Sequence, residues 1–317
     1  MADSILALAD LVKINDISVR DLGATDIFND APVLNLLNTD MASHGTQHKY
    51  VKESGAPTVG FRAANAGRDH SKSGDTVVTI DLKILDACFH VDAKLADSNP
   101  RGVDFVMSRE AKRHLRAAFS AAERQFFYGT GVDAGGFAGL ADNAGLDALA
   151  DAMVINAGGS GSGTFGDVWM IRSTSDHANV DLIMGNDGGI DIQPYLRQLV
   201  EEAGSQKKFP AYWQQIDGWI GLQVGGAKSV GRMVNFNLAD GATANTVTDD
   251  ALSELFEAFD ENAPPTHVVM NKRGRRQLQQ SRTATNGTGA PAPWPLDWEG
   301  IPIISSKSIT TYGTAVS

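Results

Sequence analysis

The sequence has little of three features that would assign it to a class of protein at once: cysteine, long apolar runs and basic charge. Its single cysteine, Cys88, cannot form an internal disulfide, which excludes a disulfide-stapled scaffold. We expect this thiol to be a small buried hydrophobic group, with a reactive nucleophile as the less favoured alternative. No apolar run approaches the roughly 20 residues of a membrane span, and MADSILALADLVKI lacks the basic start of a signal peptide. We therefore expect a protein made and used in a cytoplasm, without a membrane partner.

The charge balance excludes one further class of protein. The chain has 27 Lys and Arg residues against 38 Asp and Glu residues, for a net charge of -11. No arginine-rich arm or basic patch interleaved with aromatic residues is present, so a protein that wraps nucleic acid by counterion release is excluded. An acidic wall still suits a container that holds a polyanion without adhering to it.

Motifs for catalysis, nucleotide binding and metal binding are also missing. There is no GxSxG elbow, and the glycine-rich residues 129–139 and 158–166 lack the partners of a phosphate or dinucleotide loop. His44 and His48 lie where a strand or loop is expected, and residues 186–191 lack the closing glutamate of a calcium loop. We predict no catalytic residue, no cofactor and no metal site, with zinc at the histidines as a minor alternative.

A long helical pattern occupies residues 99–128. Asn99 and Pro100 give a start signal, Gly129 a stop, and the apolar spacing between them predicts one amphipathic helix of roughly 40 Å. The predicted core residues of this spine helix are Phe105, Leu115, Phe119, Phe126 and Phe127. The opposite face is either solvated or docks on an acidic neighbour, and it carries Arg109, Glu110, Lys112, Arg113, Arg116, Glu123 and Arg124.

A second pattern predicts a long two-stranded hairpin. A strand over residues 47–54 and an alternating strand over 76–92 flank a Gly- and Ala-rich loop with a basic tip. Such a loop is uncommon in a compact domain, and a lone hairpin is marginally stable in water. We therefore expect an extension that an adjacent subunit stabilises, and its candidate contact residues are Tyr50, Lys52, Phe61, Arg62, Arg68 and Lys72.

The remaining segments predict an apolar N-terminal arm and an α/β region. The arm begins with an amphipathic helix over residues 4–14, whose Ile5, Leu8 and Leu11 are expected to pack on the body or on a neighbour. Strands are expected at 168–173, at 266–270, at 301–304 and as a pair within 210–237. Helices are expected near 194–203, from the cap at Thr248 to 259, and over 272–280.

This order of elements, together with several short motifs, resembles the major capsid proteins of tailed bacteriophages, which have the Hong Kong 97-like shell fold. The segment Glu123-Arg124-Gln125-Phe126-Phe127-Tyr128-Gly129, followed by Gly136-Phe137-Ala138-Gly139-Leu140, is similar to that family's pattern E..ifyG......f.GL at the end of the spine helix. Residues 168–172, 219–224, 232–235 and 300–303 resemble its later sheet strands.

The resemblance implies an α+β phage capsid fold with five regions. These are an N-terminal arm over 1–43, an extended hairpin loop with its flanking strand over 44–98, the spine helix and peripheral domain over 99–149, an axial domain over 150–299, and a C-terminal strand returning to the peripheral domain over 300–317. It also implies that the loop over about 45–74 lies on the adjacent subunit and that axial domains meet at the capsomer centre.

The function implied by the resemblance is a non-enzymatic major capsid protein that self-assembles into an icosahedral head shell around packaged double-stranded DNA. Its expected partners are its own copies in hexamers and pentamers, a separate scaffolding protein, a portal and a decoration protein, with DNA nearby but not bound in a sequence-specific way. We expect a virion location after assembly in the host cytoplasm, with Arg113, Arg116 and the arm and hairpin residues as subunit contacts. The alternatives are an encapsulin-like compartment shell and, less favoured, a soluble α/β enzyme.

Overall fold

The structure is a computed structural model. It describes residues 13–14, 17–18, 28–55, 57–69, 71–142, 146, 148–149, 152–175, 179–185, 189–202, 204, 206–226, 228–287 and 290–316. The arm residues Ile5, Leu8 and Leu11 lie outside these ranges, so their predicted packing stays a prediction. At the end of that segment, β1 (Lys13–Ile14) pairs with β2 (Ile17–Ser18), where the sequence predicts the last residues of a helix.

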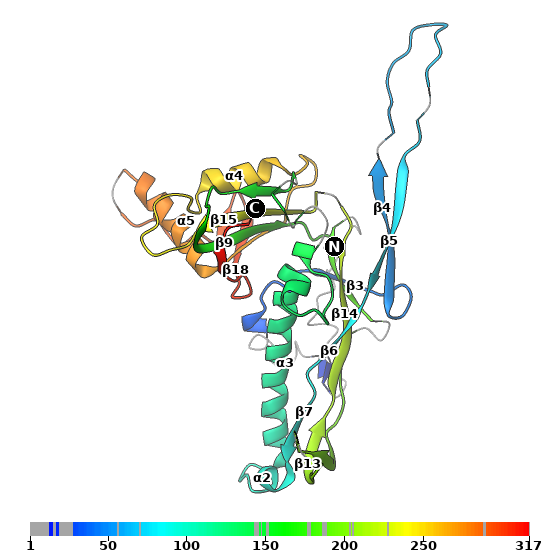
Figure 1. Cartoon of the computed structure of the whole chain (residues 1–317), viewed down its shortest axis with the longest axis vertical. Coiled ribbons are helices and arrows are strands. Elements are labelled where there is room, and N and C mark those ends of the chain that lie inside the picture. The colour runs from blue at the N-terminus through cyan, green and yellow to red at the C-terminus, as the bar shows by residue number, and fades with distance from the viewer. Residues whose placement is uncertain are drawn as a thin grey trace.

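The chain is a mixed α+β fold in three parts, which Figure 1 shows as a lobe, a stalk and a projecting hairpin. The lobe is built on a mixed sheet with the strand order β17 (Asp297–Trp298), β18 (Ile301–Ser305), β16 (His267–Met270), β9 (Ser162–Ile171), β15 (Val230–Asn237) and β8 (Val154–Asn156). Strand β19 (Tyr312–Thr314) also pairs with β9. Helices α4 (Asp249–Glu257) and α5 (Lys272–Thr285) follow β15 and β16.

The stalk contains the spine helix α3 (Val103–Tyr128) with strands beside it (Figure 1). One sheet joins β11 (Ile190–Ile192), β14 (Ile216–Val224), β10 (Val180–Met184) and β3 (Asn38–Met41), with β6 (Lys83–Asp86) also paired to β14. A second joins β12 (Leu196–Glu201), β13 (Lys208–Gln214) and β7 (Phe89–Asp92). The short helix α2 (Ala93–Asp97) precedes α3, and the 3-10 turns are η2 (Phe28–Asp30), η3 (Gly129–Gly131) and η4 (Leu140–Asp142).

The spine helix is as long as the sequence predicts, but it begins later. Its 26 residues span about 39 Å at 1.5 Å per residue. Asn99 and Pro100 lie in the turn before it, and the N-cap is Gly102, whose φ of 84° is open to glycine. At the other end Gly129 and Gly139 make a close backbone contact, because a Cβ on Gly139 would lie 2.5 Å from the Gly129 nitrogen. This contact is the physical reason for glycine at both positions of the capsid-like motif.

The predicted strand over residues 76–92 is three strands, which is a correction. β5 (Gly74–Asp81) pairs with β4 (Gln47–Gly55), β6 pairs with β14, and β7 pairs with β13. The chain changes partner at two points. The Leu82 N–H donates to Thr46 at 2.9 Å, and the Ala87 N–H donates to Ile216 at 2.8 Å. The alternating pattern therefore continues while the sheet changes, because each partner demands the same period of two.

Two other expectations are corrected in the same region. The helix expected near 194–203 is strand β12, which pairs with β13 at six positions from Leu196 to Glu201. Residues 210–237 contain parts of three strands, β13, β14 and β15, where two are predicted. Pairing with neighbouring strands outweighs the local helical pattern, since strand preference depends strongly on context.

The boundary of the expected axial domain also changes. Strands β10 to β14, over residues 180–224, form sheets with β3, β6 and β7 in the stalk, so 150–299 is not one continuous unit. The final segment enters the lobe sheet through β18 and β19, and its 306–310 loop contacts Glu123 and Tyr128 of the spine helix. Its expected return to a peripheral domain stays a prediction.

The two predicted helices near the end of the chain begin where the sequence predicts. Thr248 caps α4 by accepting the Ala251 N–H at 3.2 Å, and Asn271 caps α5 by accepting the Gly274 N–H at 2.7 Å. The last helix is longer than the predicted 272–280, and its final turns end at Thr285.

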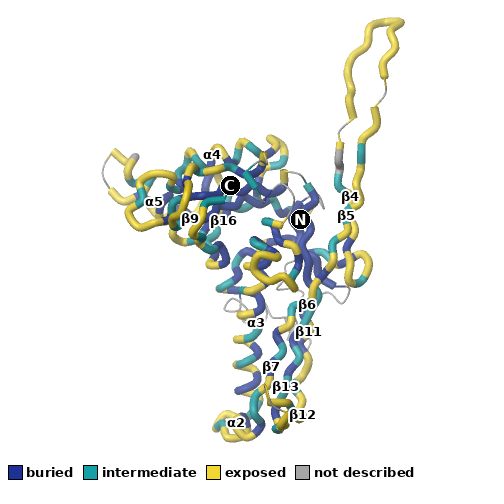
Figure 2. The backbone as a smooth tube through the Cα atoms, viewed as in Figure 1, coloured by how far each residue is buried: buried dark blue, intermediate teal, exposed yellow. Residues whose placement is uncertain are grey.

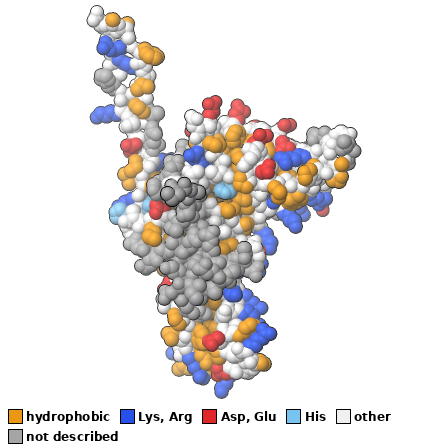
Figure 3. All heavy atoms as spheres, turned by 180° about the vertical axis from the view of Figure 1, so that it is seen from behind, with side chains coloured by type: hydrophobic (Ala, Val, Ile, Leu, Met, Phe, Trp, Pro, Cys, Tyr) orange, Lys and Arg blue, Asp and Glu red, His pale blue; other side chains and the backbone are white. Residues whose placement is uncertain are grey.

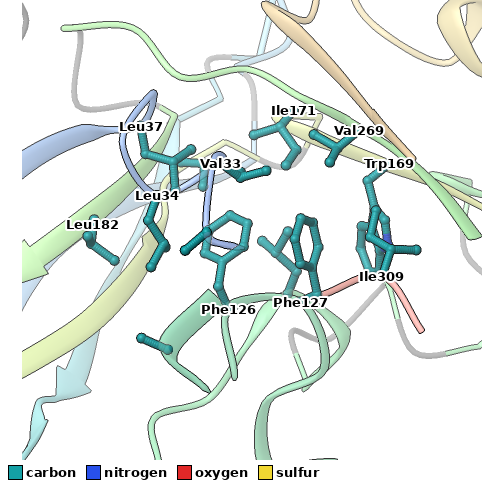
Figure 4. Packing of buried hydrophobic residues seen from close by; sticks show 14 of the residues in the cluster. Val33, Leu34, Leu37, Phe126, Phe127, Trp169, Ile171, Leu182, Val269 and Ile309 are labelled. Carbon is teal, nitrogen blue, oxygen red and sulfur yellow. The ribbon is translucent and has the colours of Figure 1, made fainter. Parts of the chain in front are cut away.

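The hydrophobic core lies where the end of α3 enters the lobe, as the burial colours of Figure 2 show. Figure 4 shows Phe126 and Phe127 pointing toward residues of the arm and of the lobe sheet. Phe127 and Trp169 have ring centroids 5.7 Å apart, and Val33 and Leu34 of the arm are buried in the same cluster. We call this region the joint.

Candidate assembly surfaces

The hairpin is the most exposed part of the described chain. β4 and β5 pair in antiparallel register from Gln47 opposite Asp81 to Gly55 opposite Gly74. Figures 1 and 2 show the segment beyond them projecting away from lobe and stalk, with exposed residues throughout its described part. Since this segment buries nothing of its own, it has no hydrophobic reason to hold a shape in the isolated chain.

The side chains of the projecting segment combine apolar and basic groups. Phe61 is fully exposed and Val59 is 85% exposed, although large apolar side chains are usually the first to be buried. Arg62, Arg68 and Lys72 are exposed beside them. The Arg62 guanidinium donates to the Ala66 carbonyl at 3.1 Å, which folds the tip on itself. The segment therefore carries an exposed aromatic side chain and three positive charges, residue types that concentrate binding energy at protein interfaces.

Tyr50, a predicted subunit contact, has a hydrogen-bond partner within its own chain. Its side chain is half-buried, and its hydroxyl donates to the Val224 carbonyl of β14 in the same chain at 3.1 Å. Burial raises the pKa of this phenol. Tyr50 therefore anchors the base of the hairpin to its own body, while Lys52, two residues along β4, is half-buried.

The exposed face of α3 has ion pairs along its length. Arg113 pairs with Glu110 at 2.7 Å with the predicted i,i+3 spacing, and Arg116 pairs with Asp30 of η2. Lys307 reaches the same Asp30 carboxylate at 2.7 Å. Hydrogen bonds from Arg116 and then Lys307 lower the pKa of Asp30 from 3.8 to about 2. Arg116 therefore binds a carboxylate of its own chain, and Arg113 is the more available of the two predicted contacts.

Four of the five predicted core residues of the spine helix are buried, and Phe105 is the exception. Leu115, Phe119, Phe126 and Phe127 are fully buried, whereas Phe105 is 36% exposed. Its ring lies between two guanidinium groups, with Arg101 at 4.8 Å and Arg109 at 5.8 Å from the ring centroid. Near its start α3 has few elements to pack against, so cation–π contacts replace burial there.

Glu123 is corrected in the other direction from Phe105. The sequence places it on the polar face of the spine helix, and the structure buries it completely. Its carboxylate accepts the N–H groups of Val33 at 2.8 Å and Leu34 at 3.3 Å, and it accepts the Ser306 hydroxyl. Burial raises the pKa of this carboxyl, and these hydrogen bonds act in the opposite direction. One side chain of the spine helix thus holds both the arm and the C-terminal loop at the joint.

A second buried group joins the C-terminal strand to the lobe. Arg232 donates to one oxygen of Asp167 at 2.8 and 3.2 Å and lies 4.9 Å from the Trp169 ring centroid. Tyr312 donates to the other oxygen at 2.6 Å, and its hydroxyl accepts the Asn235 N–H at 2.8 Å. Full burial raises the pKa of Asp167, while Arg232 and Tyr312 counteract that rise. Asp167 and Arg232 are both buried, so this group of side chains has a structural role.

Two open clefts lie on the lobe, and neither resembles an enclosed active site. One of about 350 Å³ lies between α5 and residues 239–243, and one of about 590 Å³ lies between the start of α5 and residues 305–311. Among the residues that the structure describes, no three His, Cys, Asp or Glu side chains gather as metal ligands, and no helix is long and apolar enough to cross a membrane.

Cys88 also differs from its predicted form. It is half-buried, and its sulfur accepts the Ile216 N–H at 3.4 Å. Burial and the nearby Asp86 raise the pKa of its thiol to about 11, so it is not an activated nucleophile.

The sequence reasoning missed Glu123, Asp167, Arg232 and Tyr312 as structural groups. The only available signal was an arginine inside the apolar strand segment Val230–Asn237, since a charge in such a position needs a buried partner. The partner itself could not be found, because Asp167 lies 65 residues away in the chain. The hairpin and spine candidates lie on separate elements, the projecting segment beyond β4 and the helix α3.

Solved structures similar to this chain allow a comparison of the whole fold. A chain in the solved structure of bacteriophage Epsilon15 superposes with a TM-score of 0.62 at 20% identity, covering 88% of this chain and 87% of that chain. The capsid of bacteriophage JBD30 gives a TM-score of 0.49 at 12% identity, covering 86% and 89%. The likeness to the Epsilon15 chain shows that the mixed α+β fold is that of a phage capsid protein.

The family follows from the sequence itself. The family described as major capsid protein GP7 matches residues 26–291, which is most of the chain, so this protein belongs to that family. A comparison with curated proteins gives no match. The chain is therefore a structural protein that forms the shell of a phage virion by self-assembly, and the encapsulin-like alternative is not favoured.

Proposed function

We propose that this chain forms an icosahedral head shell in which the hairpin of each subunit lies on the adjacent subunit of the same capsomer. The observation that carries the proposal is the exposed tip with Phe61 at its centre. A fully exposed phenylalanine on a segment without a core is costly to keep in water, and an interface pocket would bury it. The basic groups Arg62, Arg68 and Lys72 would then orient the tip toward an acidic neighbouring surface.

The shell we propose consists of hexamers and pentamers around packaged double-stranded DNA. The net charge of -11 supports a wall that does not adhere to the polyanion inside it. A separate scaffolding protein would guide assembly in the host cytoplasm, and a portal and a decoration protein would complete the head. The subunits would cohere without covalent cross-links, and the chain would have no catalytic role.

Within this arrangement the domains keep the expected roles with the altered boundary. The lobe would be the axial part, which meets its copies at the capsomer centre, and the stalk with residues 180–224 would be the peripheral part. Arg113 on the exposed face of α3 and the arm residues Ile5, Leu8 and Leu11 would add contacts between subunits. These assignments follow from the exposure of each surface and from the family to which the chain belongs.

Point variants at the hairpin tip test the proposal. We expect Phe61→Ser, and separately the triple charge reversal Arg62→Glu with Arg68→Glu and Lys72→Glu, to fold normally and to lose shells in negative-stain images and in sedimentation. The matched control is Leu296→Ser, because Leu296 is a similarly large apolar residue, 69% exposed, on a loop of the lobe. Shells of normal yield from both tip variants would contradict the proposed role of the hairpin.

A further inference from the structure

Helix α4 carries an acidic stripe that nothing in its own chain explains. Asp250, Glu254 and Glu257 recur at i, i+4 and i+7, so they share the face opposite the buried Leu252 and Leu255. All three side chains are exposed, and none of them forms an ion pair within the described part of the chain. The sequence of the helix contains no basic residue to balance them.

Helix α5 carries the opposite charge beside a cleft. It contains five basic residues and no acidic one, and Lys272, Arg273 and Arg276 are exposed. Arg273 and Arg276 line the cleft of about 350 Å³ together with residues 239–243. The nearest acid is Asp240, 3.8 Å from Arg276, and both of these side chains are largely exposed. We call this surface the basic cleft.

Some of these charges oppose the helix dipoles, although Asp250 in the first turn of α4 and Arg282 in the last turn of α5 are favourably placed. Glu257 is the last residue of α4, where the dipole is negative, and Lys272 and Arg273 begin α5, where it is positive. Carboxylates four residues apart, such as Asp250 and Glu254, also repel each other. Glu257, Lys272 and Arg273 are therefore unfavourably placed for the helices that bear them, and a contact outside the isolated subunit would account for them.

Within one chain, α4 and α5 are joined by an ion pair that lies outside both the acidic stripe and the basic cleft. Arg282 binds Asp249 at 2.7 Å, which joins the end of α5 to the start of α4 without involving the acidic stripe or the basic cleft. Figure 1 shows α4 along the upper margin of the lobe with α5 below it, and in Figure 3 acidic side chains gather along that same upper margin. Complementary surfaces at different margins of one subunit suit a head-to-tail contact, which closes into a ring when the rotation permits.

We propose that the acidic stripe of α4 docks on the basic cleft of a second copy of this chain within a capsomer. The inference rests on the proposed function, since it names the lobe-to-lobe contact that a ring of subunits requires. The contact sets the order and orientation of the subunits, because charge complementarity governs encounter and register more than affinity. The hairpin supplies the apolar part of the interface, and the two contacts act together around the ring.

Paired charge reversals in the full-length chain test this contact. The first variant carries Glu254→Lys and Glu257→Lys, and the second carries Arg273→Glu and Arg276→Glu. Glu257→Lys and Arg273→Glu place charges in accord with the helix dipoles, so the free subunits should melt close to the wild-type temperature. Each variant alone should reduce the fraction of protein that sediments as shells by about tenfold or more, because like charges then face each other across the contact.

A chain that combines both reversals shows whether the loss of shells comes from this contact or from a general defect of the subunit. It restores opposite charges across the interface and should recover most of the wild-type shell yield. The control Glu254→Asp with Glu257→Asp keeps the charge and should assemble normally. Normal yield from both single reversals, or no recovery in a combined chain that melts like the wild type, would overturn the inference and leave the proposed function standing. A wild-type chain that forms neither rings nor shells would instead overturn the proposed function.

Discussion

In the joint, Phe126, Phe127 and Trp169 are fully buried and Glu123 has three hydrogen-bond partners, whereas at the hairpin tip Val59 and Phe61 lie open to solvent. The joint draws its segments from the arm, the spine helix and the C-terminal loop, so a single subunit can complete it. The hairpin has no such partners within the described part of its own chain. The difference indicates that the joint determines the fold of the subunit, whereas the hairpin tip is available for contact with a neighbouring subunit.

The largest expected effect on stability comes from the spine helix. Phe119→Ala should lower the free energy of unfolding of the unassembled subunit by about 4 kcal/mol, because it leaves a cavity against Phe28, whose ring centroid is 4.7 Å away. Phe105→Ala, in the same helix, should cost less than about 1 kcal/mol, since its ring is partly solvated. Urea unfolding followed by circular dichroism measures both, and equal losses would contradict the contrast within α3.

The buried pair in the lobe should come next. Arg232→Ala leaves the Asp167 carboxylate buried without its main partner, and we expect a loss of about 3 kcal/mol in the same unfolding measurement. The matched control is Arg276→Ala, because Arg276 is exposed and its distance to Asp240 is 3.8 Å. A loss below about 1 kcal/mol for Arg232→Ala would show that the pair does not hold the C-terminal strand in place.

Glu123→Gln should cost about 2 kcal/mol near pH 4, because it replaces one of the two oxygens that accept hydrogen bonds from Val33, Leu34 and Ser306 with an NH2 group that cannot accept. The loss should depend on pH. The pKa of Glu123 in the folded state is raised above its usual 4.5, so the stability that the protonated group contributes falls as pH rises through that raised pKa. The difference between wild type and variant should therefore be smaller at pH 7 than at pH 4. A difference that grows with pH would contradict the assigned direction.

Asp30 should show the smallest effect and the opposite pH dependence. Its folded pKa of about 2 lies below the usual 3.8, so its contribution is complete above about pH 4 and is lost as pH falls toward 2. Because Arg116 and Lys307 are largely exposed, we expect Asp30→Asn to cost only about 1 kcal/mol at pH 7. Thermal melts between pH 2 and 7 measure it, with Asp240→Asn as a control that should change little.

Much of this contrast could be predicted from sequence because its causes are local. The helical period of residues 103–128 and the coreless loop between two strands follow from spacing and composition. The three-way division of residues 76–92 could not be predicted, since all three strands share a period of two and differ only in their distant partners. The same limit hid strand β12, whose partner β13 decides its conformation.

The candidate residues also divide into those that the sequence could identify and those that it could not. The exposed Phe61, Arg62, Arg68 and Lys72 could be identified because the loop that carries them lacks apolar periodicity. Glu123 could not, since helical spacing marks a glutamate as polar and its partners Val33 and Ser306 lie 90 and 183 residues away. The hydrogen bond of Tyr50 within its own chain could not be predicted for a similar reason, because its acceptor Val224 lies 174 residues away.

Shortening the hairpin is the most direct measurement of its proposed role. Replacing residues 56–73 with Asn-Gly should close β4 and β5 in a tight turn, because Gly55 already pairs with Gly74. Urea unfolding and sedimentation of this chain should give a free energy of unfolding within about 0.5 kcal/mol of the wild type and no shells. Shells of normal size and yield from the shortened chain would contradict the claim that the hairpin joins neighbouring subunits.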